Sequence, residues 1–411
     1  MEVIYKRCCG LDIHKEIVVA CLLIREGGKV LKEIRTFLTM TVDLVVLHDW
    51  LKAHQVTHVA MESTGIYWRP VFNLLEGDFT VLLVNAAHIK TVPGRKTDVK
   101  DCEWIADLLS HGLLRGSFIP PEPIRDLRDL TRYRKTLTDE RVREVNRLQK
   151  FLEGANIKLS SVATDVMGIS GRAMLEALLS GSTDPQVLSE LAKGRLRKKL
   201  PELKKALEGR FRSHHRFMVA EVLTHLDFLD EAIERVSQEV SSRIAPFSKI
   251  VESMDLIPGI NARVAEGVLS EMGVEMSCFP TEGHAASWAG LCPGNNESAG
   301  KRKSGKTRKG DQWLRRYLTE AAWAAIRKKG SYLSALYHRL VVRRGKKKAI
   351  VAVAHRLLVI IYHMIKDQAS YRELGADYFN KLNTAYVQRH HVKRLESLGF
   401  KVILEPVSKA A

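Results

Sequence analysis

Three closely spaced prolines separate two parts of the chain that follow different hydrophobic patterns. Pro120, Pro121 and Pro123 cannot lie inside a helix or a central strand without breaking its hydrogen bonds. Before them, strand-like and helix-like segments alternate. After them, apolar residues recur mostly at helical spacing. The chain is therefore expected to contain an α/β domain followed by a mainly helical, all-α region.

The first part has the segment order of a mixed α/β sheet. Apolar alternation and short apolar runs predict five strands, at residues 8–13, 17–23, 30–37, 58–61 and 80–84. Gly27-Gly28 supplies the turn between the second and third strands, and helices are expected over 42–54 and 97–114. A three-strand meander followed by helix, strand, helix, strand and helix is also the order of the ribonuclease H fold.

The second part contains a heptad repeat. Its apolar residues step by three and four over three heptads: Val219, Val222, Leu226, Leu229, Ile233, Val236 and Val240. Such an a/d seam predicts coiled-coil pairing with another helix, either within the chain or between two chains. A second helical stretch places apolar residues on one face between Leu127 and Leu137, and resumes that face between Val142 and Leu152.

The patterns predict four segments along the chain. The α/β domain covers 1–118, a helical and coiled-coil region covers 119–250, and a further helical domain covers 251–375. A polar segment at 283–312, rich in Gly, Asn, Ser, Lys and Arg, separates two helical patterns of that domain. A basic C-terminal extension covers 376–411.

The charge of the chain predicts a polyanionic partner. Lys and Arg number 65 against 47 Asp and Glu, a formal net charge of +18, while hydrophobic residues make up 45% and supply real cores. Because the positive charge lies in blocks along the chain, we expect nucleic acid rather than a membrane. The apolar stretch 349–365 is interrupted by His355, Arg356 and His363, which favours a buried helix over a membrane span.

Cysteine usage and the N-terminal residues indicate a cytoplasmic protein. The six cysteines contain no C-x-x-C pair, so we expect free thiols in a reducing compartment. A basic segment followed by an apolar one, typical of a secretory signal, does not open the chain.

Four carboxylates in the first part form a candidate metal site. Asp12 interrupts an apolar strand and Glu62 ends another, whereas Asp98 and Asp101 share one face at the start of a helix. Together they can hold hard divalent cations, Mg²⁺ above all, and such a cluster suits phosphoryl transfer. Taken singly, each acid is more often structural; the alternative for Asp12 is a salt bridge, and that for Asp98 and Asp101 is a favourable helix N-terminus.

The polar segment carries a dense group of cations that we expect to contact phosphates. These are Lys301, Arg302, Lys303, Lys306, Arg308, Lys309, Arg315 and Arg316. Interleaved Gly and Ser allow close backbone approach to a phosphate, whereas the alternative is a solvated lysine-rich surface. Residues 300–307 also satisfy the P-loop pattern, but 292–299 form a polar loop rather than the buried strand that a P-loop requires.

A short turn upstream resembles a helix-hairpin-helix motif. Leu256 to Asn261 contain Pro258-Gly259, and the motif's turn offers backbone N–H groups to a DNA phosphate. Asn261 stands where a second glycine is usual, and we expect it to adopt the positive φ that asparagine tolerates.

The ordered motifs resemble those of the DEDD transposases of bacterial insertion sequences. In the first part they are Gly10–Lys15, Met61–Tyr67 and Lys96–Asp101. In the second part they are Ile257–Ile260, Ala289–Pro293, Ser298–Lys301, Lys309-Gly310 and Leu314-Arg315. The resemblance covers about residues 5–115 and 250–370, with a coiled-coil region between, and each motif is less specific than the ordered set.

This resemblance implies a fold, an activity and partners. Residues 1–118 would be a RuvC-like catalytic domain of ribonuclease H fold, with Asp12, Glu62, Asp98 and Asp101 holding Mg²⁺. The domain at 251–375 would supply Ser298 as a nucleophile that joins covalently to DNA. The family's members are recombinases that excise and insert their own element. A structured non-coding RNA from the element guides them to donor and target DNA, and they assemble as dimers and tetramers.

Two residues depart from the family pattern, and alternatives remain at the level of sequence. Ala299 replaces the glycine common after the serine, Asn261 replaces the hairpin glycine, and Ser304 is a rival nucleophile. A RuvC-type endonuclease would use the acids and water with no protein nucleophile, and a non-catalytic protein would only bind nucleic acid. The intact acids and serine argue against the last.

Overall fold

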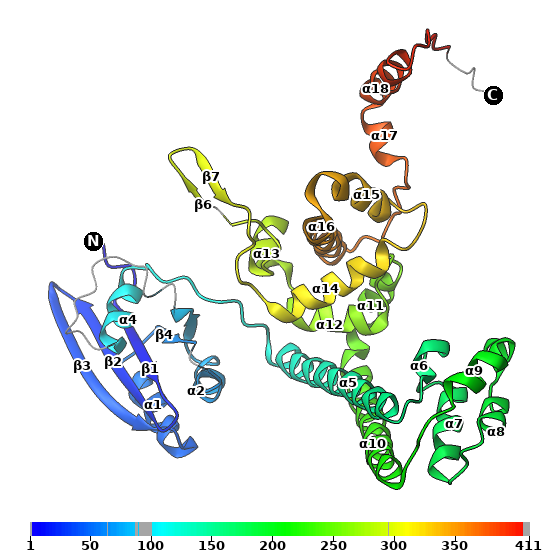
Figure 1. Ribbon diagram of the computed structural model, residues 1–411. Helices are drawn as coiled ribbons and strands as arrows, with labels where there is room; N and C mark the ends of the chain where they lie inside the picture. Colours follow the sequence, from blue (N-terminus) through cyan, green and yellow to red (C-terminus); the bar gives the residue numbers. More distant parts are fainter. Residues whose placement is uncertain (1, 64, 87–88, 90–100, 295, 406–411) are drawn as a thin grey trace. The chain divides into compact units, whose positions relative to one another are not determined.

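The computed structural model describes residues 2–63, 65–86, 89, 101–294 and 296–405. The chain divides into two compact units between Ile119 and Pro120. We call them the N-terminal unit and the helical unit, and each is described by itself (Figure 1).

A five-stranded mixed sheet forms the frame of the N-terminal unit (Figure 1). Its strands are β1 (Arg7–Ile13), β2 (Ile17–Glu26), β3 (Lys29–Leu38), β4 (His58–Glu62) and β5 (Thr80–Val84). They lie in the order β3-β2-β1-β4-β5, with β1, β2 and β3 antiparallel and β4 and β5 parallel to β1. The five predicted strands are confirmed, and the predicted α/β character with them.

Helices cover both faces of this sheet. α1 (Thr41–Ala53) and α2 (Trp68–Leu75) pack on one face, where odd-numbered β1 residues such as Leu11 and Ile13 are buried. α4 (Asp101–Ser110) packs on the other face. The two sides of β1 are therefore both apolar, as expected of a strand buried between helices.

All six cysteines are free thiols, and four of them lie in this unit. Cys8, Cys21 and Cys102 are buried on the α4 side, and Cys9 is buried on the opposite side. Burial raises the pKa of the Cys8 and Cys21 thiols to about 12, so they stay protonated and unreactive at neutral pH.

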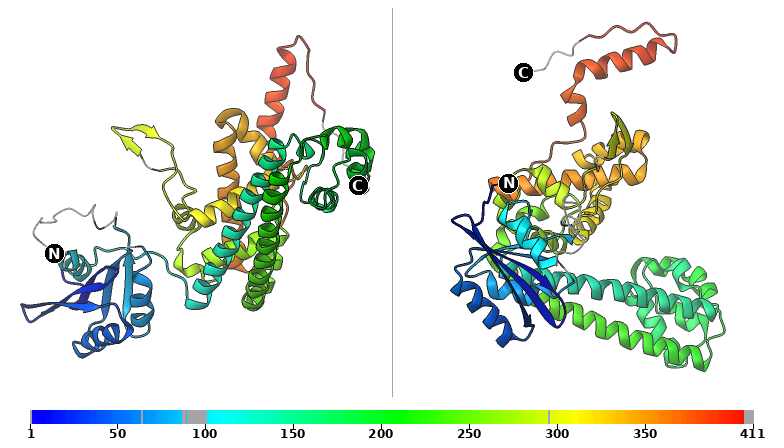
Figure 2. Two further views of the ribbon diagram at one scale, coloured as in Figure 1. Left: turned by 60° about the horizontal axis from the view of Figure 1, so that its bottom comes forward. Right: turned by 90° about the vertical axis from the view of Figure 1, so that its left-hand side faces the viewer.

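The helical unit begins with two long antiparallel helices, α5 (Glu122–Gly154) and α10 (Ser213–Ile244), shown side by side in Figures 1 and 2. Arg141 pairs with Asp230 and Arg243 with Asp126, which fixes the antiparallel register. The heptad residues of α10 are buried or half-buried against α5 and the small helices beside it. In the structure α10 packs along α5 of the same chain.

Small helices connect the end of α5 to the start of α10. They are α6 (Leu159–Val162), α7 (Ile169–Leu179), α8 (Pro185–Glu190) and α9 (Leu200–Ala206), with a 3₁₀ segment at Gly194–Lys199. Their apolar side chains share a core with Leu148 and Leu152 of α5 and with the first half of α10.

The helices between α10 and the C-terminal extension form a second cluster. They are α11 (Ser248–Asp255), α12 (Ala262–Met272), α13 (Glu282–Trp288), α14 (Gln312–Ala325), α15 (Tyr332–Arg344) and α16 (Lys346–Asp367), with 3₁₀ turns at Ala245–Phe247 and Met276–Cys278. By length and composition α16 could cross a membrane, but 56% of its most apolar window is buried, and it packs on α14, α15, α13 and α11. The core helix of a bundle has this burial pattern.

The turn between α11 and α12 corrects one expectation. Gly259 has a φ of +85°, and a Cβ there would lie 2.3 Å from the carbonyl oxygen of Ala321, so the turn is pressed against α14. Asn261 has a φ of −113° and caps α12, because its side chain accepts a hydrogen bond from the Val264 N–H. The expected positive φ at Asn261 is therefore wrong, since the residue serves as an N-cap.

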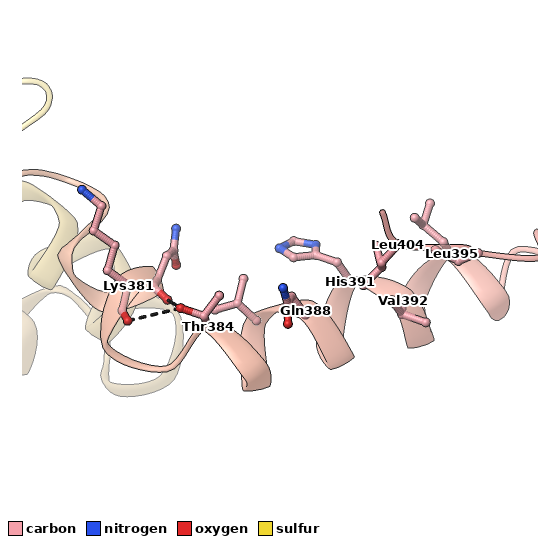
Figure 3. A pocket seen from close by; sticks show the side chains of 10 residues that line it. Lys381, Thr384, Gln388, His391, Val392, Leu395 and Leu404 are labelled. Carbon is pink, nitrogen blue, oxygen red and sulfur yellow. Dashed lines mark hydrogen bonds between the residues drawn. The ribbon is translucent and has the colours of Figure 1, made fainter. Parts of the chain in front are cut away.

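The C-terminal extension carries α17 (Tyr378–Leu382) and α18 (Thr384–Glu396), neither of which buries a side chain fully. The chain after α18 turns back, so that Leu404 lies beside α18 near Val392 (Figure 3). The two segments line an open pocket, to which Val387, Val392, Leu395, Val402 and Leu404 contribute apolar side chains.

Candidate functional site

The strand order brings Asp12 and Glu62 to neighbouring positions. Leu11 of β1 is the register partner of Met61 of β4 in a parallel pair, and the two acids follow directly. Leu11 and Met61 are both buried on the α1–α2 side of the sheet. Because side chains alternate along a strand, Asp12 and Glu62 face the opposite side, the one that α4 covers.

Because Gly10 has no side chain, the first turn of α4 lies close to β1, on the side of the sheet that Asp12 faces. A Cβ on Gly10 would lie 2.3 Å from the carbonyl oxygen of Cys102 and 2.4 Å from the backbone nitrogen of Ala106. Asp12 is two residues further along the same side of β1, and Asp101 precedes Cys102 at the start of α4. Asp12, Glu62 and Asp101 therefore share one side of the sheet, which we call the acidic face.

The acidic face is accessible to solvent. The side chain of Asp12 is 24% exposed, and its Oδ2 lies 3.2 Å from Nε2 of His14. Glu62 is half-buried and Asp101 is exposed. The partial exposure of Asp12 at the end of β1 reduces the desolvation cost that an acid inside a strand would carry.

Three of the four predicted acids are described, and they do not form a compact ligand cluster. Among the described residues, no three Asp, Glu, His or Cys side chains lie close enough together to hold a metal. Asp98, the fourth predicted acid, lies outside the described residues. The donor set itself, carboxylate oxygens at one end of a sheet, is the type that Mg²⁺ prefers.

A basic β-hairpin projects from the helical unit between α13 and α14 (Figure 1). We call residues 291–310 the arm; it contains the strands β6 (Asn296–Ser298) and β7 (Lys301–Ser304). The expected polar loop at 292–299 is therefore wrong at Asn296–Ser298, which form the short strand β6. The P-loop pattern is not a P-loop, because its central residues form β7 instead of a phosphate-binding loop.

Backbone contacts at its base hold the arm. A Cβ on Gly310 would lie 2.2 Å from the nitrogen of Gly290, so the two legs cross at two glycines. Beyond the crossing, the Gly294 N–H donates to the carbonyl of Lys306 at 2.9 Å, and Pro293 bridges Thr307.

The tip of the arm is a two-residue turn made by Ala299 and Gly300. Their φ angles are +50° and +73°, and positive φ at both central residues is what a type I′ turn requires. Ala299 accepts a left-handed conformation that costs an ordinary residue about 1–2 kcal/mol. Ser298 and Lys301 flank the turn as register partners, and both are exposed.

The rival serine has a different environment. Ser304 is half-buried, and its Oγ accepts a hydrogen bond of 3.1 Å from the Lys306 N–H. Its cross-strand register partner is Asn296.

The predicted phosphate-contacting cations divide into two groups. Lys301, Lys303, Lys306, Arg308 and Lys309 are exposed along the arm. The backbone of Arg302 belongs to β7, and its side chain lies outside the described part of the structure.

The other two cations, on α14, are engaged within the protein. Arg316 donates two hydrogen bonds to Asp139 of α5, at 2.5 and 2.6 Å, and Arg315 donates to the Gly290 carbonyl at 3.3 Å. Because of its bidentate pair, Arg316 is less available for phosphate than its position in the sequence suggested.

A buried ion pair anchors the end of the arm to α5. The Glu271 side chain is fully buried and receives a bidentate pair from Arg132, at 2.7 and 2.8 Å. Arg132 also reaches Asp311, which caps α14 where the arm ends. Sequence reasoning missed Arg132 and Glu271, because their partners lie 139 residues apart and no local spacing connects them.

The chain matches two family models of transposases. Residues 9–157 match the family model of DEDD transposases of the IS110 type, and residues 252–338 match the model described as transposase, IS116/IS110/IS902 family. The first match includes the acidic face and the second includes the arm, so the chain is a transposase, a DNA-processing enzyme. It belongs to the IS110/IS116 family, as its motifs predicted.

Curated relatives agree along most of their length. The chain is 25% identical to the transposase for insertion sequence element IS1111A of Coxiella burnetii, over 88% of this chain and 90% of that protein. It is 26% identical to the insertion element IS116 uncharacterized 44.8 kDa protein of Streptomyces clavuligerus, over 70% of this chain and 79% of the relative. It is 25% identical to the insertion element IS110 uncharacterized 43.6 kDa protein of Streptomyces coelicolor, over 68% of this chain and 73% of the relative.

Proposed function

We propose that this transposase excises and inserts its own insertion element by Mg²⁺-dependent phosphoryl transfer, with Ser298 as the nucleophile. The observation that supports this most is the position of Ser298, exposed at the tip of a basic arm. There the hydroxyl can meet a DNA phosphate without displacing a packed side chain. Ser304 is the weaker candidate because the residue is half-buried and its hydroxyl already accepts a hydrogen bond from the Lys306 N–H.

The N-terminal unit is the proposed metal-binding part, with a RuvC-like ribonuclease H fold. The sheet order β3-β2-β1-β4-β5 and the shared side of Asp12, Glu62 and Asp101 support this assignment. Together with Asp98 these acids would hold Mg²⁺, and the nuclease-like domains of DEDD transposases typically use divalent metal ions. A bound ion there would neutralise charge on the phosphate and on the attacking and leaving oxygens.

The proposed reaction conserves the energy of the phosphodiester. The serine Oγ forms a bond to phosphorus, the bond from phosphorus to one sugar oxygen breaks, and that oxygen leaves as a hydroxyl. The serine proton is lost to solvent and the leaving oxygen gains one. Because a phosphoseryl link replaces a phosphodiester link, a strand can later be rejoined without ATP.

The partners in this proposal are donor and target DNA and a guide RNA encoded beside the reading frame. The exposed arm cations would contact phosphates, which gives binding that weakens steeply with salt. The protein would act as a dimer that assembles into a tetramer on DNA, in the bacterial cytoplasm at the nucleoid. The net charge of +18 and the family membership support nucleic-acid partners.

The test is a search for the covalent adduct. The full-length protein would be incubated with Mg²⁺, RNA transcribed from the DNA flanking the gene, and a plasmid carrying that flanking DNA. We expect a protein–DNA species that survives denaturing electrophoresis and maps to the peptide containing Ser298. Ser298→Ala should abolish it, and Ser304→Ala is the matched control that should retain it. Cleavage with free 5′-phosphate and 3′-hydroxyl ends and no adduct would instead indicate a RuvC-type endonuclease, and binding without cleavage a non-catalytic protein.

A further inference from the structure

The hairpin register places one cation of the arm directly opposite the proposed nucleophile. Ser298 and Lys301 are cross-strand partners on either side of the Ala299-Gly300 turn. Directly opposite residues of an antiparallel pair have Cβ atoms about 4.5–5.5 Å apart, on the same side of the ribbon. The two side chains therefore extend together from one face of the arm tip.

The other arm cations lack this relation to Ser298. Lys303 has no register partner, because the pairing shifts between Asn296 and Glu297. Lys306 lies beyond Ser304, where its backbone carbonyl pairs with Gly294. Arg308 lies at the base, with its side chain close to Gly294.

We propose that Lys301 is a catalytic residue, whose ammonium group contacts the scissile phosphate while Ser298 attacks it. This inference rests on the proposed role of Ser298. When the Oγ–P bond forms and the bond to the sugar oxygen breaks, negative charge builds up on the non-bridging phosphate oxygens. An ammonium already held beside the phosphate stabilises that charge, and no proton has to move to or from Lys301.

The turn geometry makes this pairing rigid. A two-residue turn fixes the register of the strands beside it, so Ser298 and Lys301 cannot slip past one another. Ala299 adopts positive φ to complete the turn, a cost that persists only where the surrounding structure requires that geometry. Lys301 is exposed, and its flexible stem lets the ammonium follow the phosphate as the bond forms.

The experiment separates catalysis from binding by charge-matched variants. Lys301→Gln and Lys303→Gln remove the same charge from the same strand, and Lys301→Arg keeps it. The rate of adduct formation would be measured with the flanking-DNA plasmid and its RNA, at protein concentrations that saturate the DNA. DNA affinity would be measured separately by a binding titration. Both lysines are exposed, so neither substitution removes a packed side chain.

We expect Lys301→Gln to slow adduct formation at saturation by about 100-fold, the loss typical of one electrostatic stabiliser. Lys303→Gln should mainly weaken DNA binding, and Lys301→Arg should recover most of the rate. If the saturated rates of the two Gln variants are equal, Lys301 is only a phosphate contact and the inference is wrong. If the wild-type protein forms no adduct at Ser298, the proposed function itself has failed, which is a separate result.

Discussion

The close approach of α4 to β1 predicts that any side chain at Gly10 destabilises the N-terminal unit. Gly10→Ala would place a methyl group 2.3 Å from the Cys102 carbonyl oxygen and 2.4 Å from the Ala106 nitrogen. Both are backbone atoms, so no side chain can rotate away. Strand and helix must separate, most simply by a movement of α4 of about 1 Å, since carbon contacts are normally about 3.5–4.0 Å.

The size of the effect follows from the size of the unit. Overpacking of this kind costs about 1–3 kcal/mol of the free energy of unfolding. The unit spans 119 residues, from Met1 to Ile119. At about 2.1 cal/mol/K per residue, its unfolding entropy is about 0.25 kcal/mol/K, so the loss lowers Tm by about 4–12 °C. The effect on activity should be larger, because misplacing a catalytic group by about 1 Å can cost about 100-fold.

The assay combines stability and cleavage on the full-length protein. Calorimetry gives Tm, and hydrogen exchange by mass spectrometry shows whether the loss of protection is confined to β1 and α4. Gly77→Ala is the matched control, because a Cβ there meets nothing within 4 Å. If Gly10→Ala leaves Tm and strand cleavage equal to those of the control, α4 does not pack on β1 as described, and the acidic face must be assembled in another way.

Three further predictions concern the acids, the arm and the thiols. Asp12→Asn should abolish strand cleavage and leave nucleic-acid binding largely intact; a variant that still cleaves would remove this acid from the site. Replacing Lys303 and Lys306 by Gln should flatten the slope of log affinity against log salt by up to about 1.8, at about 0.9 per phosphate contact; an unchanged slope would make them solvated surface residues. In the folded protein only Cys278, exposed, and Cys292, half-buried, should react with a thiol reagent, and the four buried thiols of the N-terminal unit only after denaturation. Fast labelling of all six would contradict the burial described.

Local patterns predicted the elements of the N-terminal unit well. Alternation and the Gly27-Gly28 turn define β2 and β3 to within three residues, because hydrophobic period and turn chemistry act over short distances. The proximity of Glu62 to Asp12 could not be predicted from local patterns, because it depends on the pairing of β4 with β1. The family motifs indicated that these acids act together, and the strand register supplies the geometry.

The hairpin structure of the arm could not be predicted from local sequence patterns. β6 is Asn-Glu-Ser, three polar residues without alternation, so nothing local distinguishes it from a loop. The pairing of Ser298 with Lys301 follows from the turn between them, and Ala299 is a residue that rarely forms such a turn. The ion pair of Arg316 with Asp139 could not be predicted from local patterns either, because Asp139 lies 177 residues away on α5.

Because the backbones of Gly290 and Gly310 lie in close contact, a small tilt of the arm about this crossing produces a larger displacement at its tip. A fully extended chain from Gly290 to Ser298 would reach at most about 26 Å, at about 3.3 Å per residue. A tilt of only about 5° at the crossing would move the tip by up to about 2 Å, twice the misplacement that costs about 100-fold in rate. A side chain at either glycine must push the legs apart, since a Cβ would fall 2.2 Å from backbone at Gly310 and 2.8 Å from it at Gly290. Gly290 and Gly310 carry no functional group, yet they set the position of Ser298, the proposed nucleophile, at the other end of the arm.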